Sequence, residues 1–364
     1  MKIAVIGTRG IPNIQGGVET HCQELYPRLA QSGYDVTIIR RSCYVEKDNQ
    51  LSEYKGVKLK DIYAPKKKSL EAIVHSILAV IEAKNMKADI LHIHAIGPAL
   101  VTPLARLLGL KVVLTHHGPD YDRQKWGRLA KLMLKSGERL GVHYANEVIV
   151  ISEVINQIIQ QKYNRNDAHL IYNGVPEHTK DSDSTSYLQS LGIEKQQYIL
   201  TMGRFVPEKG FDLLIHAFKE IKNNPFKLVI AGDADHETPY SSQLKTLAKE
   251  EGVILTGFIT GKKLQEITAH ARLFVLPSFH EGLPIALLEA MSYRLDVLVS
   301  DIPANMEVNL PEESYFQTGN VEALGAALEK KLSNAYSLKS YDMSLYNWDT
   351  IAKQVAEVYT SHPL

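Results

Sequence analysis

The sequence of 364 residues has little cysteine and no long apolar run. Its two cysteines, Cys22 and Cys43, lack the spacing of a metal-binding pair and give no indication of a disulfide framework. No segment reaches the ~18 apolar residues that a membrane-spanning helix requires. The first seven residues lack the long apolar core and the small-residue cleavage site of a secretion signal. These absences together lead us to expect a cytoplasmic protein.

The sequence also lacks a net charge, but its two halves differ in sign. Residues 1–180 hold 25 Lys and Arg against 17 Asp and Glu, which gives +8, and residues 181–364 therefore carry −8. A basic half joined to an acidic half indicates that one domain faces something anionic. Random drift between the halves is the alternative explanation. We expect no nucleic-acid partner.

Strand-like apolar segments alternate with segments of helical periodicity along the whole chain. The strand-like segments are 2–7, 35–39, 89–94, 111–115, 147–151, 198–202, 226–231, 253–256, 273–276 and 296–299. Such alternation predicts α/β domains with parallel sheets covered by helices on both faces. The polar stretch 176–195 interrupts the pattern and reads as a connection between two Rossmann-like domains, 1–175 and 193–345. An amphipathic helix is predicted in the last segment, 346–364.

A glycine-rich segment follows the first predicted strand. It runs from Gly7 through Gly16 and Gly17 to the next helix, where backbone amides and a helix N-terminus can meet a phosphate. Its glycines do not have the offsets of the dinucleotide fingerprint, which argues against a nicotinamide oxidoreductase. A tight turn without any ligand would also use glycine. The segment alone is therefore a weak signal.

Two cations stand at the start of the second predicted domain. Arg204 follows the strand 198–202, and Lys209 precedes the next helix. The forked guanidinium and the compact ammonium group suit a diphosphate. A helix N-terminus disfavours cations, so their position indicates an anionic ligand rather than an exposed basic pair.

Two carboxylates flank a segment that we expect to be a buried helix. Glu281 precedes the apolar run 283–288, and Glu289 follows it. Both could accept hydrogen bonds from hydroxyl groups. Alternatively, Glu281 could cap the helix and Glu289 could be a solvated side chain. These roles would explain either residue singly, but they explain less well why both occur together with the two upstream cations.

With these motifs, the chain resembles the retaining glycosyltransferases of family four, which have the GT-B fold. The resemblance covers nearly the whole chain and depends on the order and spacing of its motifs. These are Gly16-Gly17, Thr115-His116-His117-Gly118, Asn173-Gly174-Val175, Gly203-Arg204, Glu208-Lys209-Gly210, Glu281-x₇-Glu289, Ser300 to Glu307, and the helix that begins at Trp348. The opening Gly7 to Pro12 is most similar to bacterial rhamnosyltransferase-like members of surface-polysaccharide biosynthesis.

The resemblance implies a metal-independent hexosyltransferase that needs no cofactor and retains the anomeric configuration. The donor would be a nucleotide diphosphate sugar, with UDP favoured over dTDP or GDP, and the acceptor a saccharide. Arg204 and Lys209 would hold the diphosphate, and the last helix, 346–364, would pack back on the first domain. The other implied donor contacts are His117 and Glu281 at the sugar, Glu289 at the ribose, Phe258 and Ile259 at the base, and Gly16, Gly17, Gly203, Gly282, Leu283 and Pro284 near the diphosphate.

Two groups of residues resemble metal sites. Asp233-Ala234-Asp235 has the D-x-D pattern of another glycosyltransferase fold, but we expect a solvated turn there. His92, His94, His116 and His117 alternate or adjoin on predicted strands, which favours histidines of the core or the cleft over a metal site.

Residues 122–140 form a basic amphipathic segment. Trp126, Leu129, Met133 and Leu140 share one helical face, and Arg128, Lys131, Lys135 and Arg139 share another. Such a helix can lie on an anionic membrane, although an apolar core face with a solvated basic face is the alternative. Lys66 to Lys68, ahead of the apolar segment 70–81, favour the membrane hypothesis. We therefore expect peripheral docking at the inner face of the plasma membrane and a lipid-linked acceptor.

Two other functions fit part of this pattern. A GT-B-fold nucleotide-sugar epimerase would release a changed sugar nucleotide without any acceptor. A non-catalytic nucleotide-sugar-binding protein would not need the set Arg204, Lys209, Glu281 and Glu289.

Overall fold

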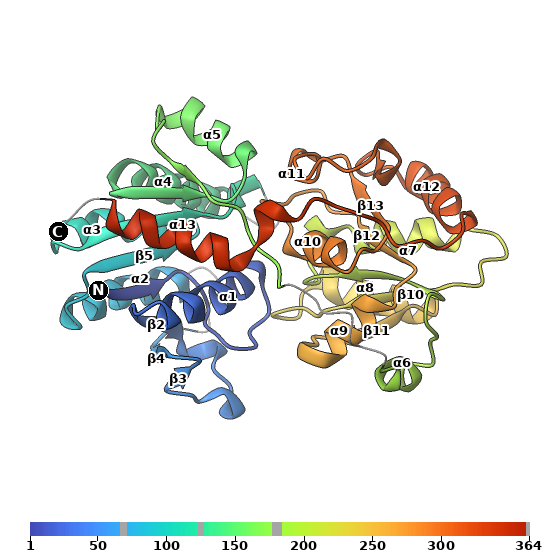
Figure 1. Ribbon diagram of the computed structural model, residues 1–364, viewed down its shortest axis with the longest axis horizontal. Helices are drawn as coiled ribbons and strands as arrows, with labels where there is room; N and C mark the ends of the chain where they lie inside the picture. Colours follow the sequence, from blue (N-terminus) through green and yellow to red (C-terminus); the bar gives the residue numbers. More distant parts are fainter. Residues whose placement is uncertain (66–70, 123–126, 177–183, 362–364) are drawn as a thin grey trace. The chain divides into compact units, whose positions relative to one another are not determined.

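The computed structural model describes residues 1–65, 71–122, 127–176 and 184–361 (Figure 1). It divides into two compact units. The first contains Met1–Gly174 and Tyr346–Leu364, and the second contains Val175–Leu345. Each unit has a sheet of its own and a separate apolar core, so the two are described in turn.

The first unit is built on an eight-stranded sheet. Its strands are β1 (Lys2–Ile6), β2 (Asp35–Arg41), β3 (Glu53–Tyr54), β4 (Val57–Ile62), β5 (Ile90–His94), β6 (Lys111–His116), β7 (Glu147–Val150) and β8 (His169–Leu170). Their order is β3-β4-β2-β1-β5-β6-β7-β8, with every pair parallel except β3 and β4. The chain winds outward from β1 in both directions, so β1 is the switch point of the sheet.

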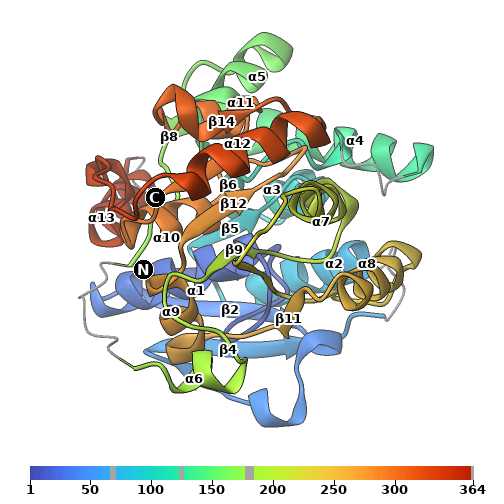
Figure 2. The same ribbon diagram turned by 90° about the vertical axis from the view of Figure 1, so that its right-hand side faces the viewer.

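Helices cover both faces of this sheet. They are α1 (Gly17–Gln31), α2 (Glu71–Asn85), α3 (Thr102–Leu107), α4 (Arg128–Tyr144), α5 (Glu153–Tyr163) and α13 (Trp348–Thr360), with short turns η1 (Ser42–Tyr44), η2 (Lys47–Asn49), η3 (Pro98–Val101) and η4 (Asp120–Asp122). Helices α1 and α13 pack together, whereas α2, α3 and α4 lie on the opposite face (Figure 2). Trp348 and Tyr359 of α13 are buried in the same core cluster as Ile3 and Leu25.

The second unit contains a six-stranded, all-parallel sheet. Its strands are β9 (Tyr198–Met202), β10 (Lys227–Ala231), β11 (Ile254–Gly257), β12 (Leu273–Leu276), β13 (Val297–Ser300) and β14 (Tyr315–Phe316), in the order β11-β10-β9-β12-β13-β14. Its helices and turns are α6 (Ser186–Ser190), η5 (Pro207–Lys209), α7 (Phe211–Lys219), α8 (Pro239–Glu250), α9 (Gly261–Ala269), α10 (Ile285–Ser292), α11 (Pro303–Met306), η6 (Glu312–Ser314) and α12 (Val321–Ser333). The turn η7 (Ser344–Tyr346) spans the boundary between the two units. Two Rossmann-like α/β domains, as predicted, are confirmed.

The polar stretch 176–195 is not only a connection, because it contains α6. The backbone N–H groups of Tyr187 and Leu188 donate to a carboxylate oxygen of Glu266 in α9, at 2.7 and 2.9 Å. Ser184 donates to the other oxygen at 2.8 Å. A carboxylate some 80 residues away along the chain thus satisfies the first turn of this helix, which has few apolar residues of its own.

Helix α4 differs from the amphipathic helix predicted over 122–140. It begins at Arg128, and Trp126 lies outside the described residues, as do Lys66 to Lys68. Leu129 is 72% exposed, so the alternative, in which this apolar face belongs to the core, does not hold for Leu129. Leu132 is also 62% exposed, because the first half of α4 packs less closely on the unit than the part around Gly137 and Gly141, which are buried.

Candidate functional site

The carboxyl ends of four neighbouring strands carry the polar residues of the second unit. Arg204 follows β9, Asp235 follows β10, Phe258 follows β11 and Glu281 follows β12. Because parallel strands end at the same edge of a sheet, these residues gather there. The strand order reverses at β9, between β10 and β12, which is where open α/β sheets bind their ligands.

Lys209 and Glu281 form an ion pair at this edge, although 72 residues separate them. Lys209 Nζ lies 2.5 Å from Glu281 Oε1, which also accepts a hydrogen bond of 2.6 Å from the Ser278 hydroxyl. The chain reaches this arrangement through Gly210, whose φ of 63° is left-handed. A Cβ there would stand 2.4 Å from the Pro277 carbonyl oxygen, so only glycine lets η5 approach the loop after β12.

Arg204 forms a second ion pair with Asp235, at 3.1 Å between Nη1 and Oδ2. Asp233, two residues earlier, lies 2.9 Å from Lys245 of α8. The prediction of a solvated turn at 233–235 is therefore wrong for Asp235, which is half-buried and neutralises Arg204. The sequence did signal this through the position of the turn after β10, the strand adjacent to β9.

The other predicted donor contacts of this unit lie around the same edge. Gly282, Leu283 and Pro284 form the loop that leads into α10. Glu289 lies in the second turn of that helix and is half-buried. Phe258 and Ile259 directly follow β11 at the side of the sheet, and the Phe258 side chain is exposed. Ion pairs thus join Lys209 to Glu281 and Arg204 to Asp235, and Glu289, Phe258 and Ile259 lie around the same edge.

In the first unit, the predicted glycines lie at the start of α1. Gly16 has a positive φ of 149°, and a Cβ on it would stand 2.0 Å from a carboxylate oxygen of Glu19. The buried Glu19 accepts hydrogen bonds from the Arg9 backbone N–H, at 2.9 Å, and from the Thr8 hydroxyl, at 3.3 Å. Glu19 therefore fixes the glycine-rich segment. Its position in the first turn of α1 was the available signal.

Three histidines meet at the carboxyl edge of the first sheet. His117 directly follows β6, His94 ends β5, and His21 comes from α1. His94 Nδ1 lies 2.9 Å from His117 Nε2, and the His21 ring centroid lies 5.0 Å from that of His117. His21 is the member that the sequence did not reveal, because a single histidine on the apolar face of a helix carries no motif.

The other histidines considered from the sequence have different partners. His92 bonds the Tyr359 hydroxyl at 2.6 Å and the Thr115 hydroxyl at 2.7 Å, and His116 lies 2.9 Å from the Glu138 carboxylate. Burial lowers the pKa of His92 to about 3. The four histidines of the sequence motif therefore do not converge as one set.

The pKa values of the three clustered histidines are also low. Burial lowers the pKa of His21 to about 4, against a smaller opposing effect of its hydrogen bond to Asn173. Burial and the neighbouring imidazoles place the pKa of His94 and of His117 well below the ordinary value. All three imidazoles are consequently neutral at neutral pH.

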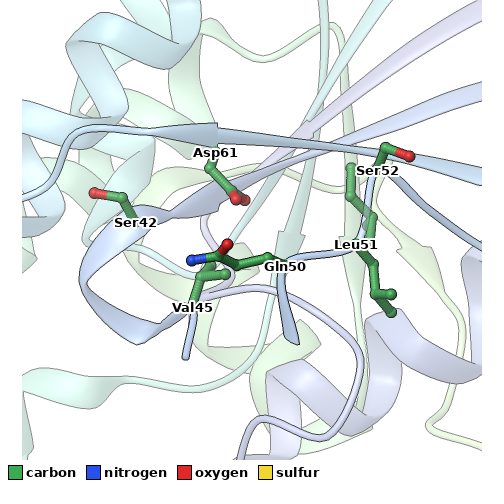
Figure 3. Close-up of a pocket in the computed structure, with 7 residues that line it drawn as sticks. Ser42, Val45, Gln50, Leu51, Ser52 and Asp61 are labelled. Atoms are coloured by element: carbon green, nitrogen blue, oxygen red, sulfur yellow. The ribbon is translucent and has the colours of Figure 1, made fainter. Parts of the chain in front are cut away.

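A pocket of about 410 Å³ opens beside the ends of β2 and β4 in the first unit (Figure 3). It is lined by Ser42, Val45, Gln50, Leu51, Ser52, Leu59 and Asp61. Asp61 is anchored by Arg40, whose Nε lies 2.6 Å from Oδ1. The lining offers hydroxyl, carboxamide and carboxylate groups that could bond to hydroxyls of a ligand.

Helix α4 carries the remaining basic residues singled out from the sequence. Arg128, Lys135 and Arg139 are exposed, and Lys131 is half-exposed. Among the residues that the structure describes, none of the helices combines the length and the apolar composition needed to cross a membrane.

Family models match both units of the chain. Residues 15–178 match the model described as Glycosyltransferase Family 4, and residues 183–348 match Glycosyl transferases group 1. The chain is a glycosyltransferase. Similar proteins include an uncharacterized glycosyltransferase of Methanocaldococcus jannaschii, which is 25% identical over 99% of this chain and 98% of its own length. The amylovoran biosynthesis glycosyltransferase AmsD of Erwinia amylovora is 23% identical over 47% of this chain and 48% of its own.

Solved structures agree with the fold of this glycosyltransferase. Sucrose-phosphate synthase of Thermosynechococcus elongatus has a TM-score of 0.82 at 20% identity, over 99% of this chain and 98% of that chain. Anabaena HepE, solved in complex with UDP and glucose, has a TM-score of 0.80 at 18% identity over the whole of both chains. These likenesses establish the GT-B fold of two Rossmann-like domains, as predicted.

Proposed function

We propose that this glycosyltransferase moves a sugar from a nucleotide diphosphate donor to a saccharide acceptor, with retention of configuration and without a metal ion. The donor binds the second unit at the carboxyl edge of its sheet. Arg204 and Lys209 hold the diphosphate, Glu281 bonds hydroxyls of the sugar, Glu289 bonds the ribose, and the main chain at Phe258 and Ile259 contacts the base. UDP-sugars are the favoured donors, in keeping with the HepE complex.

The observation that carries this proposal is that two ion pairs lie at the carboxyl edge of the second sheet. Arg204 with Asp235 and Lys209 with Glu281 keep two cations beside the switch point of the sheet. A diphosphate can take the place of the carboxylates on these cations, because charge-assisted bonds to phosphate are strong and Arg binds it in a forked geometry. Two fixed cations would then stabilise the charge of the departing nucleotide, the role that a metal ion has in other enzymes.

The surroundings of Glu281 also favour a mechanism without a covalent glycosyl intermediate. Such an intermediate requires a carboxylate nucleophile that is free to attack the sugar. The Lys209 ammonium and the Ser278 hydroxyl both bind Oε1 of Glu281, which makes that oxygen a weak nucleophile. We propose that a donor phosphate oxygen instead accepts the proton of the acceptor, on the face from which the nucleotide leaves.

Donor binding and metal independence can be tested with the intact protein. In a thermal-unfolding panel of nucleotide sugars, a true donor at ~100 times its dissociation constant should add ~2.7 kcal/mol to the free energy of unfolding. With that donor, transfer should survive EDTA, and NMR of the product should show retained configuration. Loss of activity with EDTA and recovery with Mg²⁺ or Mn²⁺ would refute metal independence and favour metal binding at Asp233 and Asp235.

We further propose that the acceptor is a lipid-linked saccharide of cell-surface polysaccharide synthesis, reached at the inner face of the plasma membrane. The exposed Leu129 and Leu132 stand on α4 among Arg128, Lys131 and Lys135, a combination suited to an anionic lipid surface. The exposed Ile77, Leu78 and Ile81 of α2, on the same face of the sheet, add apolar area. The polar pocket of Figure 3 suits the hydroxyls of a saccharide. The name of AmsD places that relative in polysaccharide biosynthesis.

Vesicle flotation separates this proposal from the donor assignment. Wild type should bind vesicles that contain anionic lipid, and less as salt screens charge over ~10 Å at 0.1 M. Reversing Lys131 and Lys135 to Glu, or replacing Leu129 and Leu132 by Ser, should release it. A matched control reverses Lys219 and Lys245 of the second unit. If wild type stays unbound at low salt yet glycosylates a soluble acceptor, only the membrane proposal fails.

A further inference from the structure

We propose that His21, His94 and His117 form a binding site for a divalent transition-metal ion of the zinc class. One nitrogen of each imidazole lies within 4.8 Å of the others, and together they are the one such group of potential metal ligands among the residues that the structure describes. His21 and His94 are buried, and His117 is partly open to solvent. The three histidines belong to the first unit, whereas Arg204 and Lys209 belong to the second.

The hydrogen bonds of His21 decide which of its nitrogens carries the proton. Nδ1 lies 2.9 Å from the Asn173 amide oxygen, an acceptor only, so Nδ1 carries the proton of the neutral ring. Nε2 is therefore an unprotonated lone pair. It is buried and has no hydrogen-bond partner among the described residues. A buried acceptor without a donor is costly, and a cation would satisfy it.

His94 can be oriented in the same way. Its Nε2 lies 2.5 Å from the Tyr26 hydroxyl, and its Nδ1 points to His117 Nε2 at 2.9 Å. If Nε2 donates to the Tyr26 oxygen, Nδ1 presents a lone pair that accepts a hydrogen bond from His117 Nε2–H. Metal binding would replace that hydrogen bond, with the His117 proton shifting to its Nδ1. Metal-bound histidines commonly use their second nitrogen as His94 uses Nε2, and such partners fix the ring orientation.

The chemistry of the donor set selects the class of ion. Three neutral imidazoles suit Zn²⁺ and other transition metals, whereas Mg²⁺ and Ca²⁺ require oxygen ligands. Zinc–nitrogen bonds of about 2.0–2.1 Å in tetrahedral geometry hold ligating nitrogens roughly 3.3 Å apart, so His94 Nδ1 and His117 Nε2, now 2.9 Å apart, would separate slightly to admit the ion. Zinc sites with three protein ligands keep a fourth position for water or another small ligand. The partly exposed side of His117 is where that ligand would enter.

Metal binding can be measured without any assay of transfer. Apo-protein prepared with a chelator should bind one Zn²⁺ by calorimetry and one Co²⁺ with the intense visible bands of four-coordinate cobalt, and Mg²⁺ should not compete. The Trp348 ring, centred 5.3 Å from His21, provides a second signal, because Co²⁺ should quench its fluorescence. Zn²⁺ should also raise the melting temperature.

Variants connect the binding to these three residues. His21→Gln and His117→Ala should each weaken Zn²⁺ binding at least about tenfold. His143→Ala, at an exposed histidine of α4, should bind as wild type does. Because His117 is partly exposed, its variant should fold even if His21→Gln does not, and circular dichroism of both checks this. The proposal is overturned if wild type binds no Zn²⁺, which would mean that a water molecule rather than a metal ion satisfies the His21 lone pair. It is also overturned if His117→Ala binds Zn²⁺ as tightly as wild type does.

Discussion

The two units present the carboxyl edges of their sheets in opposite electrostatic states. At the edge of the first, His21, His94 and His117 are neutral imidazoles packed against one another. At the edge of the second, Arg204 and Lys209 form ion pairs with carboxylates. Both edges grow from the same Rossmann-like topology, so the difference comes from side chains alone.

The difference shows how each edge can respond to a ligand. Cations that are already paired can exchange one anion for another, so the second edge is prepared for a diphosphate at modest cost in desolvation. Buried imidazoles cannot gain a proton without losing solvation, so the first edge resists charge and offers lone pairs instead. Function in this family fold therefore follows from the site and not from the sheet.

The largest expected effect follows from breaking the charged edge. Lys209→Ala and Glu281→Ala should each reduce transfer by about 10²–10³-fold, because a fixed charge at the leaving group is lost. Both side chains lie in a turn or loop, so the fold should persist. Steady-state kinetics and thermal unfolding measure the two effects separately. Lys219→Ala is the matched control, since Lys219 pairs with Glu251 at 2.5 Å on the surface. Near-normal turnover in a correctly folded Lys209→Ala variant would contradict the assignment of Lys209 to the donor site.

Acidification should lower the stability of the first unit, because its buried histidine His92 is neutral in the folded state. The folded-state pKa of His92, about 3, lies below the ordinary value of 6.5, so the unfolded chain binds more protons below pH 6.5. Stability should thus fall as the pH drops from 7 to 5, by about 2 kcal/mol for this residue. Chemical denaturation at both pH values tests this. His92→Gln should be less stable at pH 7 but have a flatter pH dependence, whereas His143→Ala should follow wild type. Equal pH dependence in all three proteins would show that a buried, neutral His92 does not cause the loss of stability in acid.

A smaller effect is expected from removing the carboxylate that pairs with Arg204. Asp235→Asn removes the charge that opposes a diphosphate at Arg204, so nucleoside diphosphate should bind about two- to fivefold more tightly, the size of a partly exposed ion pair. Isothermal titration with UDP measures this. Asp233→Asn, next to Lys245 instead, should leave the affinity close to that of wild type. Weaker binding by Asp235→Asn would mean that Asp235 orients Arg204 for the ligand.

Local rules of sequence predicted much of the fold. The helix predicted after Gly16 and Gly17 is α1, Gly17–Gln31, because its apolar period and flanking glycines are local signals. The strand segments were also visible, since strands buried on both faces are almost wholly apolar. Helix α6 was missed because Glu266, which satisfies its first turn, is distant in the chain.

The candidate sites were predictable to the extent that they lie in motifs. Arg204, Lys209 and Glu281 stand at strand ends with glycine nearby, and the structure brings Lys209 and Glu281 into contact. His21 and Asp235 gain their meaning from partners 152 and 31 residues away. No local pattern encodes such pairs. The exposure of Leu129 likewise depends on how α4 packs, and helical periodicity alone could not show it.

The return of α13 to the first unit has a consequence for the order of synthesis. Trp348, Tyr359 and the other buried residues of α13 complete a core whose remaining members precede residue 175, and the Tyr359 hydroxyl bonds His92. A ribosome that adds about 5–20 residues per second needs roughly 10 to 40 seconds to travel from residue 174 to residue 360. During that interval the apolar residues that α13 later covers are exposed. The nascent first unit is therefore the part of this enzyme for which a chaperone has the most to shield.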